Sequence, residues 1–77
     1  MNLYIISQST NTGYDTYSDA VVAAESSLTA RRINPNGEWE EDYSSWADSP
    51  DQVTVELIGT AIEGTEEGII LASFHAG

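Results

Sequence analysis

Apolar residues in this chain gather into short runs that polar stretches separate. The first run, residues 3–6, is β-branched and aromatic and predicts a strand. A second run, residues 20–24, is compatible with strand or helix, and the helix start that follows it favours a strand. Two later runs, residues 53–57 and 69–74, complete a set of four expected strands.

The two later runs differ in their patterns. Val53, Val55 and Leu57 alternate with polar residues, which is typical of a half-buried strand. Residues 69–74 are apolar almost throughout, which favours a central strand or one that is covered on both faces. We therefore expect a core that includes Val53, Val55, Leu57, Ile69 and Leu71.

A short helix is predicted between the second and third strands. Ser26 or Ser27 can accept hydrogen bonds from the exposed amides of a first turn. Ala30 and Ile33 lie three residues apart, on one helical face, and residues 34–37 (Asn-Pro-Asn-Gly) end the helix. The order β-β-α-β-β predicts an α+β fold: a four-stranded, mainly antiparallel sheet with one short helix across a face.

Length and composition narrow the class of protein. Seventy-seven residues predict a single domain, residues 1–77. Cysteine is absent, so the chain has no disulfide and no thiolate chemistry. The first residues lack a basic region followed by a long apolar run, so we expect a cytoplasmic protein.

Charge is the most unusual property of the chain. Thirteen Asp and Glu residues stand against Arg31 and Arg32 alone, which gives a net charge of −11. This charge argues against binding to nucleic acid or to an anionic membrane, and it favours a basic protein partner. The alternative is that acidity serves solubility, but solubility requires a moderate charge with both signs mixed.

Six of the carboxylates lie between residues 38 and 51, together with two tryptophans. If the charge were spread evenly over roughly 4,600 Å², an interface of about 800 Å² would hold only about two charges. Duplex DNA carries one phosphate per ~1.7 Å, so a clustered segment imitates it better. The tryptophans could equally cover the core. The predicted partner-binding residues are Glu38, Trp39, Glu40, Glu41, Asp42, Trp46, Asp48 and Asp51.

Catalytic chemistry is missing from the sequence. The lone histidine, His75, is expected in a solvated tail, without a partner that would make it a general base. No phosphate-binding or dinucleotide-binding motif occurs. The acidic run 38–42 could supply calcium ligands but lacks the EF-hand spacing. We therefore expect no enzyme activity, no cofactor and no specific metal site.

Several stretches resemble short proteins encoded by phages and prophages: residues 1–8, 13–25, 30–35 and 68–77. Among these the chain is similar to small acidic anti-CRISPR proteins. The resemblance implies an inhibitor that acts in the bacterial host cytoplasm on a type I surveillance complex, with type I-C as the candidate subtype. It implies that the inhibitor occupies the DNA-binding surface of that complex. The alternative function is a phage structural or assembly accessory that acts through protein–protein contacts.

Overall fold

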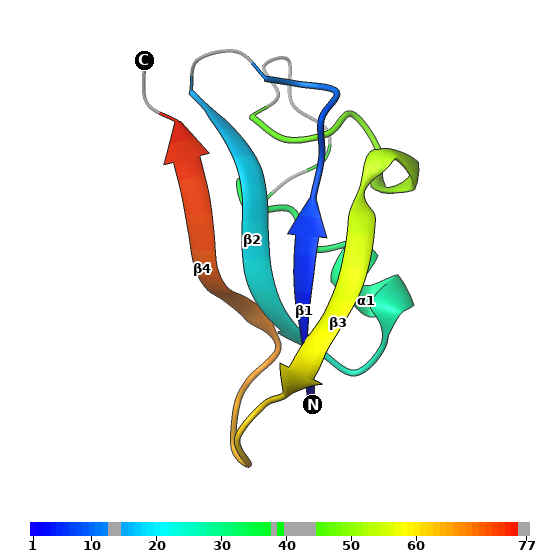
Figure 1. Cartoon of the computed structure of the whole chain (residues 1–77), viewed down its shortest axis with the longest axis vertical. Helices are drawn as coiled ribbons and strands as arrows, with labels where there is room; N and C mark the ends of the chain where they lie inside the picture. Colours follow the sequence, from blue (N-terminus) through cyan, green and yellow to red (C-terminus); the bar gives the residue numbers. More distant parts are fainter. Residues whose placement is uncertain (13–14, 38, 40–44, 76–77) are drawn as a thin grey trace.

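The computed structural model describes residues 1–12, 15–37, 39 and 45–75, with the backbone alone for residues 74 and 75. Four strands form one sheet in the order β3-β1-β2-β4, and each neighbouring pair is antiparallel (Figure 1). A helix, α1, and a 3₁₀ turn, η1, lie between β2 and β3. The elements are β1 (Asn2–Ser7), β2 (Thr16–Ala24), α1 (Ser27–Arg31), η1 (Pro50–Gln52), β3 (Thr54–Thr60) and β4 (Gly68–His75). The predicted α+β class is confirmed.

Other described residues cover one face of the sheet, and none of them covers the other, which we call the open face. The covered face packs against α1, which lies behind the strands in Figure 1, and against part of the α1–β3 connection. Successive side chains of a strand point to opposite faces, so alternate residues of β1 and β2 reach this core. The buried apolar residues are Tyr4, Ile6, Ala20, Val22, Ala23, Ala24, Ala30, Trp46, Ala47 and Val53, and all except Ala23 form one cluster.

The helix begins as the sequence predicts. The Ser26 hydroxyl accepts a hydrogen bond from the amide of Thr29 at 3.2 Å, which satisfies one of the first free donors of the helix. Ala30 is fully buried and Ile33 packs against the core, although α1 ends at Arg31 and Ile33 lies beyond the C-cap residue Arg32. After the helix, Gly37 adopts a φ of 99°, a left-handed conformation that glycine accepts without strain.

The prediction for the last strand is wrong. β4 is an edge strand, and Leu71 is 69% exposed because it lies opposite Val21 on the open face. Ile69 faces Val22 but is 40% exposed at the edge of the sheet. A run of apolar residues indicates burial, but it does not show which strands will flank it.

The core prediction for β3 is correct in part. Val53, just before the strand, is buried at 3% exposure, and Val55 is partly buried against the core. Leu57 is 60% exposed, although its partner Tyr4 is buried. β3 forms the other edge of the sheet, and its register shifts between Leu3 and Tyr4. Leu57 therefore lies at the rim of the covered face, on an edge strand.

The expectation of a solvated tail around His75 is also wrong for its backbone, which pairs with Thr16 at the end of β4. None of the helices in the described part of the chain is long and apolar enough to cross a membrane.

Candidate functional site

A buried glutamine organises the end of the sheet where β1 ends and β2 begins. The Gln8 amide nitrogen donates to the carbonyl oxygens of Asn11 and Tyr17, both at 2.7 Å. Its amide oxygen accepts from the backbone N–H groups of Thr10 and Asn11, at 3.0 and 2.8 Å. One side chain thereby holds Thr10 and Asn11, in the β1–β2 connection, against the first residues of β2. Nothing in the hydrophobic pattern points to this role.

The segment that precedes β3 is held against the same end. The carbonyl oxygen of Ser45 accepts from the amide of Tyr17 at 2.8 Å, and that of Trp46 accepts from the Asn11 side chain at 3.2 Å. The Gln52 side-chain oxygen accepts from the amide of Asp48 at 2.9 Å. These hydrogen bonds hold the β1–β2 connection and the segment before β3 together, and the two form one surface.

Among the described residues, three exposed carboxylates lie on this surface, which we call the acidic end: Asp15, Asp48 and Asp51. Asp15 precedes β2 with a φ of 58°, a left-handed conformation that aspartate adopts more readily than most residues. Asp51 lies in the first turn of η1. Asp48 and Asp51 belong to the predicted partner-binding set, and Asp15 does not.

The two tryptophans of that set take different positions. Trp46 is fully buried in the core, so it is removed from the set of surface contacts. Trp39 is partly buried against the core, and its indole N–H donates to the carbonyl oxygen of Arg32 at 2.8 Å. Trp46 therefore serves the core, and Trp39 packs against the core while one part of its surface stays exposed. The remaining predicted residues lie outside the described part of the chain: Glu38, Glu40, Glu41 and Asp42.

A second group of exposed carboxylates lies at the opposite end of the sheet. Glu25 stands between β2 and α1, and three more occupy the β3–β4 connection at the bottom of Figure 1. We call this group the distal carboxylates: Glu25, Glu63, Glu66 and Glu67. Two further acids, Asp19 and Glu56, lie on the open face of the sheet.

The size of the molecule can be compared with that of DNA. Its longest dimension is 35 Å, which is about one helical turn of duplex. A duplex of that length carries about 20 phosphate charges at one per ~1.7 Å. The net charge of −11 therefore provides about half of the charge of DNA over the same length. Arg31 and Arg32, the two positive side chains, are both at the end of α1.

No known protein family, curated protein or solved structure matches this chain. Among the described residues, no group of three His, Asp or Glu side chains is placed to hold a metal ion.

Proposed function

We propose that the protein is an inhibitor that binds the basic DNA-binding groove of a nucleic-acid-handling complex and excludes DNA from it. The observation that supports this proposal is a net charge of −11 on a body 35 Å long. Carboxylates stand at both ends of that body and on its open sheet face. Carboxylates in such an array can take the places of phosphates opposite Lys and Arg side chains.

The particular partner that we propose is a Cas subunit of a type I CRISPR surveillance complex, with type I-C as the candidate subtype, in the cytoplasm of a bacterial host. This partner follows from the resemblance to acidic anti-CRISPR proteins, and the surface is compatible with it. Electrostatic attraction would act mainly on the association rate and on the choice of partner. The protein needs no catalytic residue, cofactor or metal for this function.

A phage structural or assembly accessory is the second candidate. The observation in its favour is the open sheet face, where Leu71 and other apolar side chains are exposed and no element in the described part of the chain covers them. Such a face suits contact with another protein. It does not account for the excess of negative charge.

Charge reversal at the acidic end tests the inhibitor proposal. We expect Asp48→Lys with Asp51→Lys to weaken binding to a purified type I surveillance complex by tenfold or more, because like charges would then meet in the groove. Surface plasmon resonance on the parent and the variant measures the change. The matched control is Glu63→Lys with Glu66→Lys, which changes the net charge equally at the distal end.

Three outcomes can be distinguished. A larger loss of affinity in the Asp48 and Asp51 variant than in the control variant supports the acidic end as the contact surface. Equal losses would mean that the carboxylates of both ends act together, and retained affinity in both variants would contradict the proposal. The sequence-based expectation for Glu40, Glu41 and Asp42 is tested in the same way, by reversal to lysine.

A further inference from the structure

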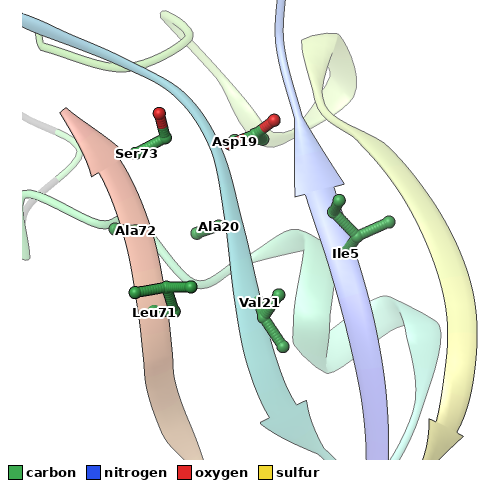
Figure 2. Close-up of a pocket in the computed structure, with 7 residues that line it drawn as sticks. All are labelled: Ile5, Asp19, Ala20, Val21, Leu71, Ala72 and Ser73. Carbon is green, nitrogen blue, oxygen red and sulfur yellow. The ribbon is translucent and has the colours of Figure 1, made fainter. Parts of the chain in front are cut away.

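The open face of the sheet contains a hollow of about 290 Å³ (Figure 2). It is lined from three strands: β1 contributes Ile5, β2 contributes Asp19 and Val21, and β4 contributes Leu71 and Ser73. These side chains come from the face opposite to the core, since their strand neighbours Ile6, Ala20 and Val22 are buried.

The lining is divided into an apolar row and a polar row. Ile5 pairs with Val21, and Val21 pairs with Leu71, so these three side chains cross the sheet side by side. Asp19 pairs with Ser73 in the next row of the same face, and Figure 2 shows both oxygens beyond the apolar row. The two rows are two residues apart along β2, which corresponds to about 6.8 Å.

The charges around the hollow are negative. Asp19 forms one border, and Glu56 lies beside Ile5 on the same face. Arg31 ends α1 and Arg32 is its C-cap, and α1 packs against the other face. Two copies stacked by these faces would bring carboxylates against carboxylates, and each copy carries a net charge of −11. Charge complementarity therefore indicates a basic occupant.

We infer that this hollow binds one Lys or Arg side chain of the protein partner. The methylene stem would lie along Val21 and Leu71, and the charged head would reach Asp19 and Ser73. This inference rests on the proposed function only in so far as that function requires a basic partner.

The chemistry of long basic side chains fits both rows. Lys and Arg bury their methylene stems on apolar surfaces while the charged head reaches a polar site. A four-carbon lysine stem is comparable in length with the spacing between the rows. Asp19 is partly buried, so an ion pair there would be less screened by water than one at a fully exposed carboxylate. The Ser73 hydroxyl oxygen can accept a hydrogen bond from a second N–H group of the same head.

The test uses two blocked tripeptides, Ala-Lys-Ala and Ala-norleucine-Ala, in ¹H–¹⁵N NMR titrations of the full chain. The norleucine peptide keeps the apolar stem but lacks the charge. We expect the lysine peptide to shift the amide signals of Asp19, Val21, Leu71 and Ser73 at concentrations where the norleucine peptide does not. Asp19→Asn should weaken binding of the lysine peptide by about three- to tenfold, and Leu71→Ser should weaken it by a similar factor.

The controls are Glu63→Gln and Ile62→Ser, which remove the same chemical groups at exposed positions away from the hollow, and they should bind like the parent. Shifts confined to the acidic end or the distal carboxylates would contradict the inference, because they would show charge attraction alone. Sedimentation that showed a dimer formed through this face would contradict it as well. The test uses no surveillance complex, so its failure is distinct from a failure of the proposed function.

Discussion

At the scale of single residues, the polar side chains that shape the acidic end could not be foreseen from the hydrophobic pattern. Gln8 follows the apolar run of β1, after the pattern has ended. It can be buried because its side-chain amide forms hydrogen bonds with backbone groups through both its nitrogen and its oxygen. Trp46 was ambiguous for a different reason. An aromatic residue among acids suits an interface or a small core equally well, and the fold uses it in the core.

The role of Gln8 leads to a prediction about stability. Gln8→Glu replaces a donor by a carboxylate oxygen that would face the carbonyl oxygens of Asn11 and Tyr17. We expect the free energy of unfolding to fall by at least about 2 kcal/mol, because buried acceptors then meet an unpaired charge. Urea denaturation followed by circular dichroism measures the change.

Gln52→Glu is the matched control. The Gln52 oxygen acts as an acceptor toward Asp48 and Thr10, and a carboxylate retains that ability. If both variants lost the same stability, the hydrogen bonds of Gln8 would not explain the order of this end.

At the scale of elements, the sequence predicts which strands and which helix form, but not which neighbours cover each of them. Alternation, β-branching and the serine before α1 were sufficient for four strands and one capped helix. The position of each strand in the sheet depends on pairings between distant segments, and local periodicity contains no information about them. For this reason the apolar run of β4 suggested a central strand although β4 forms an edge.

The exposed edge of the sheet also leads to a prediction that separates apolar residues of similar size. Ile6 is fully buried, so Ile6→Ala should reduce the free energy of unfolding by about 2–5 kcal/mol. Leu57 is 60% exposed, so Leu57→Ala should cost less than about 1 kcal/mol. Thermal and urea denaturation of the two variants provide the comparison. A loss at Leu57 as large as the loss at Ile6 would mean that another element covers this edge.

At the scale of the whole molecule, charge is the property that sequence alone establishes most completely. The net charge and the lack of lysine follow from composition, and composition alone favours a basic partner. The distribution of the charge requires the fold, which separates the acidic end from the distal carboxylates along a body 35 Å long. At physiological salt, screening acts over about 8 Å. The two ends therefore interact with a partner independently, and each can be tested separately.

The most direct test of the central claim is competition for DNA. A purified type I surveillance complex is loaded with labelled target duplex, the protein is added in increasing amounts, and the bound DNA is followed by fluorescence anisotropy. We expect the DNA to be released as the protein saturates the complex, and the competing affinity to fall as salt rises from low to physiological levels, because the contacts are ionic. Unchanged DNA binding at a saturating concentration of the protein would contradict the account.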